Sequence, residues 1–153
     1  MADYVLSPEL LESLQSKFPG IEVDEAQVVT VPSEDLIPFM TEIKENPGYA
    51  MDFLTNLTAA DYQDRFEMVY NLVSLAHCRT LTVKAKIEDK DNPRIASLCP
   101  LWGGADWQER EVYDLLGIAF TGFPGHPTRI FLEDNFKGHP LRKDFQWQGG
   151  REA

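Results

Sequence analysis

The last third of the chain is the part that most restricts the fold. After Gly117, glycine and proline recur so often that no regular helix or strand can run for long. The same stretch is rich in aromatic residues, which disordered tails usually lack. These side chains need a surface on which to pack: Phe120, Phe123, Phe131, Phe136, Phe145 and Trp147. The pattern predicts an extended C-terminal tail that buries its aromatic residues on another protein and packs poorly on its own domain.

The preceding residues carry the periodic patterns of a globular domain. Ser7 is placed to cap a first helix, with Pro8 and Glu9 in the first turn. A second helix is expected to begin at Ser33, with one apolar side that reaches Ile43.

Four strands are expected between and after these helices. The first, residues 28–31, is short and β-branched, and the second, residues 51–57, runs into a turn at residues 59–61. The third and fourth should form an antiparallel hairpin, because residues 66–73 alternate partly and residues 81–87 alternate cleanly. The residues of the last strand expected to face the core are Leu81, Val83, Ala85 and Ile87.

The order of these elements defines the fold class. Helix, strand, helix, three strands and a final helix predict an α+β fold, namely a two-layer mixed sheet with helices on one face. A long irregular C-terminal tail follows. The expected division is an α+β body over residues 1–117 and an extended partner-binding tail over residues 118–153.

The final helix of the body, residues 106–117, is the best specified. Asp106 and Glu109 fit a capping box, and Gly117 fits the position just after the helix. Arg110 and Asp114 are four residues apart and are expected to pair. Two carboxylates, Glu109 and Glu111, suggest acid–base catalysis, but residues two apart on a helix do not face each other. A capped, salt-bridged helix is the favoured interpretation.

Composition and charge exclude several functions. The net charge is −11, with the excess of acid in residues 1–125, which argues against binding nucleic acid or an anionic membrane. No apolar stretch approaches the length of a membrane span. Cys78 and Cys99 follow no pairing pattern, and the N-terminus lacks the features of a signal peptide, so a reducing compartment is expected.

No cofactor-binding or metal-binding motif is recognisable, so catalytic, cofactor-binding and metal-ligating residues are all expected to be absent. The glycine-rich nucleotide loops are missing, and two cysteines are too few for an iron–sulfur cluster held by this chain alone. His126 and His139 each lie between glycine and proline, with no further ligands at zinc-like spacing.

Several segments together resemble a known family. The run E-R-E-V-Y-D-L-L-G-I-A-F at residues 109–120 and the block G-H-P-L-R-K-D-F at residues 138–145 are similar to the C-type subunit of the bacterial NADH:quinone oxidoreductase, respiratory complex I. Residues 52–75 and the segment P-L-W-G-G-A-D-W at residues 100–107 resemble the same family, which is also known as the respiratory-chain 30 kDa subunit family.

The resemblance implies a non-catalytic subunit of the peripheral arm, on the cytoplasmic side of the cell membrane. It implies docking on the D-type subunit, which resembles a hydrogenase large subunit, and contact with adjoining iron–sulfur subunits. The complex would use iron–sulfur clusters, FMN, NADH and quinone and would translocate protons. One alternative is the equivalent subunit of an energy-converting nickel–iron hydrogenase or formate hydrogenlyase. Another is a stand-alone soluble enzyme, which the lack of an acid–base–nucleophile set disfavours.

The residues expected to bind the partner lie on the final helix and in the tail. Arginine among aromatic residues is the usual composition of an interface hot spot, and Arg142 is expected to meet a carboxylate of the partner. The full set is Glu109, Arg110, Asp114, Arg129, His139, Pro140, Leu141, Arg142, Lys143, Asp144 and Phe145.

Overall fold

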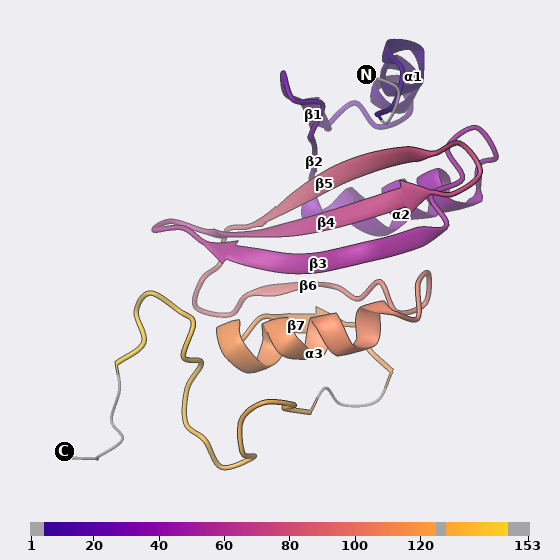
Figure 1. Ribbon diagram of the computed structural model, residues 1–153. Helices are drawn as coiled ribbons and strands as arrows, with labels where there is room; N and C mark the ends of the chain where they lie inside the picture. Colours follow the sequence, from indigo (N-terminus) through magenta and orange to yellow (C-terminus); the bar gives the residue numbers. More distant parts are fainter. Residues whose placement is uncertain (1–4, 125–127, 147–153) are drawn as a thin grey trace.

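A computed structural model describes residues 5–124 and 128–146 and has the α+β architecture expected from the sequence (Figure 1). Its main sheet is mixed and has the strand order β1-β2-β5-β4-β3. The bounds are β1 Glu22–Val23, β2 Val29–Val31, β3 Phe53–Asp61, β4 Phe66–Ser74 and β5 Arg79–Ile87. A small second sheet pairs β6 (Arg94–Ala96) in parallel with β7 (Ala119–Thr121).

The two N-terminal helices begin where their capping residues predict. Ser7 caps α1 (Pro8–Lys17), because its Oγ accepts a hydrogen bond from the Leu10 amide at 3.4 Å. A short 3-10 turn, η2 (Ser33–Asp35), leads into α2 (Leu36–Glu45), and Pro38 falls in the first turn of α2, where a missing N–H is tolerated. The buried side of α2 covers one face of the sheet through Leu36, Phe39, Met40 and Ile43.

The predicted hairpin is confirmed and forms the centre of the sheet. β4 and β5 pair antiparallel along their whole length, from Phe66 opposite Ile87 to Ser74 opposite Arg79. The four β5 residues expected to face the core are all buried. Together with Met68, Tyr70 and Leu72 of β4, they pack beneath α2 and form the main hydrophobic core.

β3 runs further than the sequence suggested. The turn expected at residues 59–61 is wrong, because Ala59, Ala60 and Asp61 continue the ladder opposite Met68, Glu67 and Phe66. The chain turns at residues 62–65 instead, where the Tyr62 amide donates to the Arg65 carbonyl at 2.8 Å. Cross-strand pairing has outweighed the weak strand propensity of alanine and aspartate.

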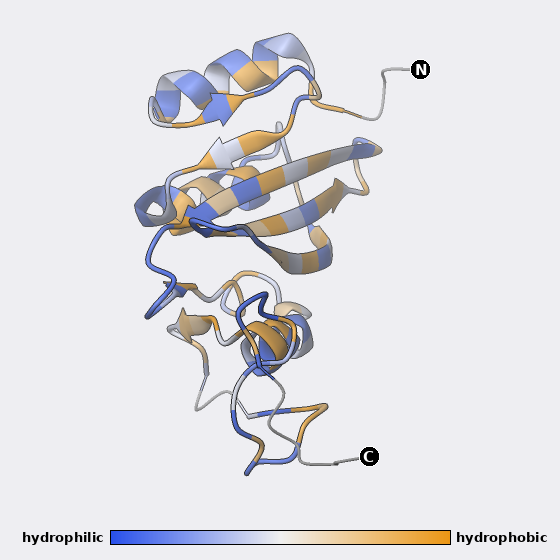
Figure 2. Ribbon diagram, turned by 90° about the vertical axis from the view of Figure 1, so that its left-hand side faces the viewer, coloured by the Kyte–Doolittle hydropathy of each residue, from blue (hydrophilic) through white to orange (hydrophobic). Residues whose placement is uncertain are grey.

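The opposite face of the main sheet is open. In Figures 1 and 2, α2 lies on one side of the sheet, and no helix formed by residues 5–124 or 128–146 lies across the other side. The burial pattern agrees, since β4 and β5 alternate between buried and partly exposed residues. Helices on one face of a mixed sheet are the arrangement that the sequence predicted.

The body continues beyond the expected boundary at residue 117. Ile118 and Phe120 are buried in the core, and β7 pairs with β6. The irregular tail therefore begins after Thr121. The final helix, α3 (Ala105–Leu116), flanks the edge of the sheet, where Gln108 Oε1 accepts from the Leu57 amide of β3 at 2.6 Å.

Candidate interaction surface

Asp114, on the last turn of α3, fixes the tail to the body. Its side chain is fully buried, and Oδ1 accepts from Arg129 Nη1 at 2.8 Å. Oδ2 accepts from three successive backbone amides, those of Ile130, Phe131 and Leu132, at 3.2, 2.9 and 3.1 Å. Burial opposes ionisation, but the amides and the guanidinium outweigh it and hold the pKa of Asp114 below its usual value. The Arg129 guanidinium and three backbone amides of the tail thus converge on this one carboxylate.

The next part of the tail closes the C-terminal end of α3. The last carbonyls of a helix have no partner within the helix. Here His139 Nδ1 lies 2.9 Å from the Asp114 carbonyl, the Leu141 amide donates to Leu115 at 2.9 Å, and Arg142 Nε donates to Leu116 at 2.6 Å. The cationic side chain of Arg142 also complements the negative end of the helix dipole.

A second anchor joins the tail to the β3–β4 end of the sheet. Asp61 Oδ2 accepts from the Lys143 amide at 2.9 Å, and Asp61 Oδ1 pairs with Lys90. The buried ring of Phe66 lies 5.3 Å from the Arg142 guanidinium carbon and 5.0 Å from Lys90 Nζ. Burial acts against ionisation of Asp61, yet Lys90 and the Lys143 amide keep its pKa below the usual value.

These contacts correct one expectation about the tail and show where a second expected residue lies. The expectation that it packs poorly on its own domain is wrong, because its two anchors involve Asp114 and Asp61 of the body. Arg142 donates its Nε to the Leu116 carbonyl of its own chain, and its meeting with a partner carboxylate stays a prediction. The first Gly-His-Pro block, with His126, and the aromatic residue Trp147 lie outside the described residues.

Glu109 has a structural partner that the sequence analysis missed. It is fully buried, and its carboxylate accepts from Ser97 Oγ at 2.6 Å and from the Leu98 amide at 2.7 Å. Cys99 Sγ lies 3.3 Å from the same group. Burial raises the pKa of Glu109 despite these hydrogen bonds, and burial together with the nearby Glu109 charge raises the pKa of the Cys99 thiol to about 11.

The expected capping box and the expected Arg110–Asp114 pair are both wrong. α3 begins one residue before Asp106, with Gly104 at the cap, so Glu109 points into the chain instead of back to the helix start. Instead, Arg110 Nη1 lies 3.9 Å from Asp106 Oδ1, and Arg110 Nη2 donates to Thr128 Oγ1 at 2.8 Å. The Asp114 carboxylate, which Arg110 was expected to meet, forms its ion pair with Arg129 instead.

Most of the sequence-predicted partner residues gather at one end of α3, and their contact with a partner stays a prediction. Asp114, Arg129 and the segment from His139 to Lys143 form the anchors described above. Pro140 is partly buried and Asp144 is exposed. The Phe145 ring stacks on the Phe136 ring, with 6.2 Å between the ring centroids. Three contributing residues were not predicted: Asp61, Phe66 and Lys90. No local sequence signal points to them, because they lie far from the tail in the chain.

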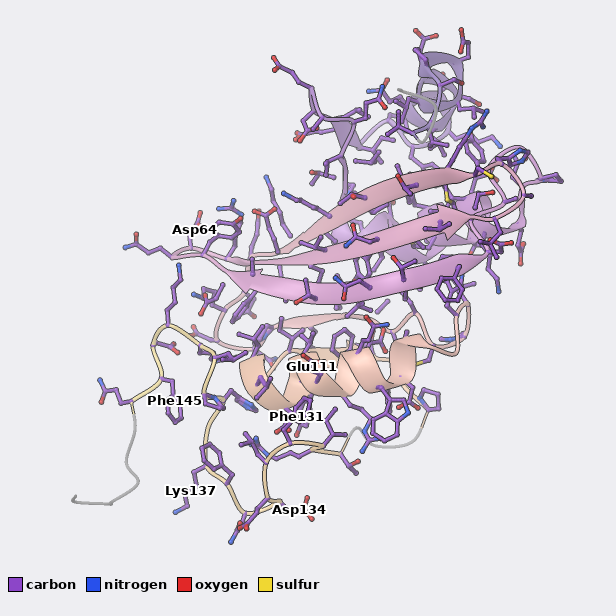
Figure 3. All side chains as sticks on the ribbon, viewed as in Figure 1. Asp64, Glu111, Phe131, Asp134, Lys137 and Phe145 are labelled. Atoms are coloured by element: carbon purple, nitrogen blue, oxygen red, sulfur yellow. The ribbon has the colours of Figure 1, made fainter. Side chains whose placement is uncertain are left out.

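Large apolar side chains remain exposed around the anchored tail. The side chains of Trp107, Phe131 and Leu141 are 65%, 64% and 60% exposed. The backbone amides of Phe131 and Leu141 are nevertheless hydrogen-bonded within the chain. Arg110 stacks over the Trp107 ring at 4.7 Å, and Figure 3 shows Phe131 on the tail segment next to α3. We refer to Trp107, Arg110, Phe131 and Leu141 as the α3–tail surface. Aromatic and arginine side chains are enriched at protein interfaces.

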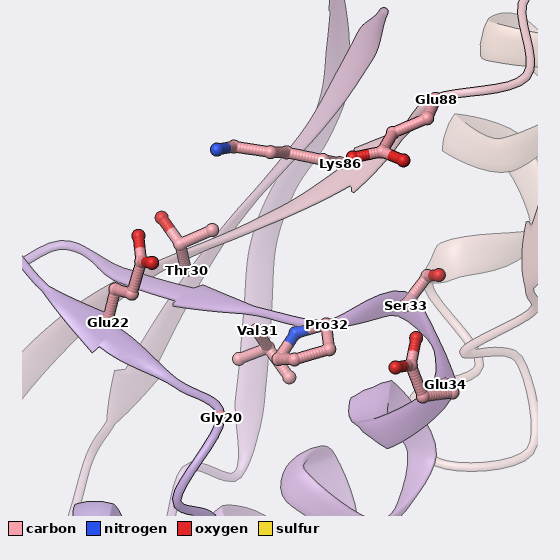
Figure 4. Close-up of a pocket in the computed structure, with 9 residues that line it drawn as sticks. All are labelled: Gly20, Glu22, Thr30, Val31, Pro32, Ser33, Glu34, Lys86 and Glu88. Atoms are coloured by element: carbon pink, nitrogen blue, oxygen red, sulfur yellow. The ribbon is translucent and has the colours of Figure 1, made fainter.

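A hollow lined mostly by polar and charged residues lies elsewhere. It has a volume of about 360 Å³ and lies between β1, β2 and the end of β5 (Figure 4). Glu22, Glu34, Glu88 and Lys86 line it, without a histidine or cysteine. Within residues 5–124 and 128–146, no three His, Cys, Asp or Glu side chains are arranged to hold a metal ion, and no helix could cross a membrane.

The tight junction at Gly117 leads to a prediction. Gly117 has a φ of 77°, and a Cβ atom at this position would lie 2.5 Å from His139 Cδ2. Gly117→Ala should therefore displace His139 and lower the melting temperature, whereas Gly103→Ala, with open space around it, should change it little. Thermal melting of both variants, followed by circular dichroism, provides the comparison. Equal melting temperatures would contradict this description of the junction.

Comparisons with known proteins converge on one family. The family model for the respiratory-chain NADH dehydrogenase 30 kDa subunit matches residues 29–151. The C-type subunit of the NADH-quinone oxidoreductase of Moorella thermoacetica is 44% identical over 145 residues, which cover 90% of this chain and 94% of the relative. The mitochondrial NADH dehydrogenase iron-sulfur protein 3 of Candida albicans is 39% identical over 133 residues. The match covers 85% of this chain and 46% of that relative.

A solved structure adds a likeness in three dimensions. A chain of the archaeal membrane-bound sulfane sulfur reductase, a respiratory membrane complex, has a TM-score of 0.77 and 25% sequence identity. The match covers 92% of this chain and 85% of the other.

Proposed function

Because this chain belongs to the family of the respiratory-chain NADH dehydrogenase 30 kDa subunit, we propose that it works as a non-catalytic subunit of a complex I-like NADH:quinone oxidoreductase. The observation that carries this proposal is the 44% identity to the C-type subunit of such an enzyme along 94% of that relative. The resemblance shared by residues 109–120 and 138–145 falls on the helix and tail that form the α3–tail surface.

We propose that the α3–tail surface binds the D-type subunit near its quinone site. In support, the anchors at Asp114 and Asp61 hold the tail in one conformation before any partner arrives. A pre-ordered segment loses less conformational entropy on binding than a flexible one. Trp107, Phe131 and Leu141 then supply apolar area that is already exposed and in place.

The remaining features of the proposal concern the assembled complex. The chain would bind no cofactor itself, and iron–sulfur clusters, FMN, NADH and quinone would be held by other subunits. The chain would also contact adjoining iron–sulfur subunits. The part of the complex that contains it would lie on the cytoplasmic side of the cell membrane. The role of this chain would be to hold the D-type subunit in position during electron transfer and proton translocation.

Co-purification tests the proposal. A tagged chain expressed in its host should bring down a membrane complex with NADH:quinone reductase activity that contains a D-type subunit. Phe131→Asp combined with Leu141→Asp should reduce recovery of that subunit at least about tenfold, because burying one unpaired carboxylate costs several kcal/mol. The melting temperature of the chain itself should change little, since both side chains are exposed.

A control substitution is available outside the α3–tail surface. Leu75 is 67% exposed in the β4–β5 turn, so Leu75→Asp makes one of the two leucine- or phenylalanine-to-aspartate changes at an exposed site outside the α3–tail surface. It should leave recovery unchanged. Loss of recovery in both variants, or in neither, would contradict docking through the α3–tail surface.

A second candidate function has one observation in its favour. The similar chain in the sulfane sulfur reductase belongs to a respiratory membrane complex whose name specifies a different reaction. We therefore keep the alternative of an energy-converting complex with another donor or acceptor, including a nickel–iron hydrogenase or formate hydrogenlyase. Nickel in the co-purified complex, together with hydrogen production and no NADH oxidation, would favour this alternative.

A further inference from the structure

The open face of the main sheet carries a mostly uncharged area that the α3–tail surface does not use. Two rows of side chains cross it from β3 to β5 in register. Asn56 lies opposite Asn71, which lies opposite Thr82, and Thr58 lies opposite Val69, which lies opposite Lys84. We refer to these six residues as the open sheet face.

Few charges interrupt this area. An antiparallel sheet can leave one face to water, and such a face is then commonly polar and charged. Lys84 is the single charged residue of the six, and Glu67 and Lys86 follow in the next row on this face. At the end of the face, Val73 is partly exposed and its cross-strand neighbour Phe53 is 53% exposed. Exposed apolar side chains beside uncharged polar residues are suited to the core of an interface.

The charges at the border of the face indicate what covers it. The side chains of Lys84 and Lys86 form no ion pair or hydrogen bond with any residue that the structure describes, although acids greatly outnumber bases in the chain. The neighbouring acid of the face, Glu67, is already held by Arg65 at 2.6 Å. A second copy packed on the same face would bring lysines toward lysines, which argues for an acidic partner of a different kind.

We propose that the open sheet face docks a second neighbouring subunit, which presents uncharged side chains to Asn56, Thr58, Val69 and Asn71 and a carboxylate to Lys84 and Lys86. This inference rests on the proposed function, because it requires the chain to be part of a complex. It adds an interface on a different side of the molecule from the α3–tail surface. The chain would then join two subunits of the complex.

Substitutions on the face test the proposal in the whole complex. Thr58→Lys and Val69→Glu place a charge in the mostly uncharged area, and each should lower the yield of complete complex at least about tenfold. Val69→Thr keeps the shape and the strand propensity without a charge and should assemble normally. Ser13→Lys, on the exposed side of α1, is the control for an added charge elsewhere.

Charge reversal and cross-linking decide the identity of the occupant. Lys84→Glu should lower assembly, and a photo-reactive side chain at position 58 should cross-link to a subunit that co-purifies with the wild-type complex. Cross-linking to a second copy of this chain, or normal assembly of Thr58→Lys, would overturn the proposal. If Val69→Glu lowers the melting temperature of the chain, Thr58→Lys and the cross-link still decide, because Thr58 is exposed. Failure of the wild-type chain to co-purify at all would instead refute the proposed function.

Discussion

Replacing Asp114 with alanine should release residues 128–146 from the body while leaving the main sheet folded. The change removes the acceptor of Arg129, whose side chain is only 12% exposed, and of three consecutive backbone amides. Removing one partner of a buried ion pair typically costs about 3–5 kcal/mol. Hydrogen exchange should measure this loss directly, as much faster exchange of the Phe131 amide than in the wild type.

The same carboxylate predicts the effect of pH on the tail. Because folding lowers the pKa of Asp114, its stabilising contribution is present above the usual value of 3.8 and is lost as the pH falls through the lower folded value. Acidification should therefore lower the protection of the Phe131 amide, measured relative to its intrinsic exchange rate at each pH, more in the wild type than in Asp114→Ala. Asp134→Ala, which removes an exposed tail carboxylate, should match the wild type. Slow exchange in Asp114→Ala would mean that the aromatic contacts alone hold the tail.

The body of the fold was predictable because its signals are local. The α1 cap needs only Ser7 and the residues that follow it, and the β4–β5 hairpin needs only the alternation within each strand. β3 was misplaced at its end because strand pairing with β4, several residues further along the chain, overrode local propensity.

The candidate surface was predictable only in part. Gly, Pro and aromatic residues correctly indicated an ordered, irregular tail, but composition does not tell whether such a tail packs on its own chain or on another. The anchors join residues far apart in sequence, such as Lys143 and Asp61, separated by 82 positions. The true partner of Asp114 was equally hidden, because Arg110 at a spacing of four looked suitable while Arg129 reached it through the fold.

Glu109 is the second residue for which a large effect is expected. Glu109→Ala leaves the buried Leu98 amide and Ser97 hydroxyl without their acceptor, and it opens a cavity beneath α3. One unsatisfied buried donor costs about 1–3 kcal/mol, so two donors and lost packing should total about 3–5 kcal/mol of unfolding free energy. Glu109→Gln keeps the volume and one acceptor oxygen, and a loss of only about 1–2 kcal/mol is expected. Urea denaturation of both variants measures these losses.

The pH dependence of the unfolding free energy shows whether Glu109 acts as a titrating carboxyl group or only fills space in the core. Burial raises the pKa of Glu109 above its usual 4.5, so the folded state favours the protonated form. Its contribution to stability is then fully present below 4.5 and is lost as the pH rises through the folded value. The advantage of the wild type over Glu109→Gln should therefore shrink as urea unfolding is repeated at increasing pH, since glutamine does not titrate. A constant difference would mean that the hydrogen bonds from Ser97, Leu98 and Cys99 fully offset burial, and that Glu109 stays ionised within the fold.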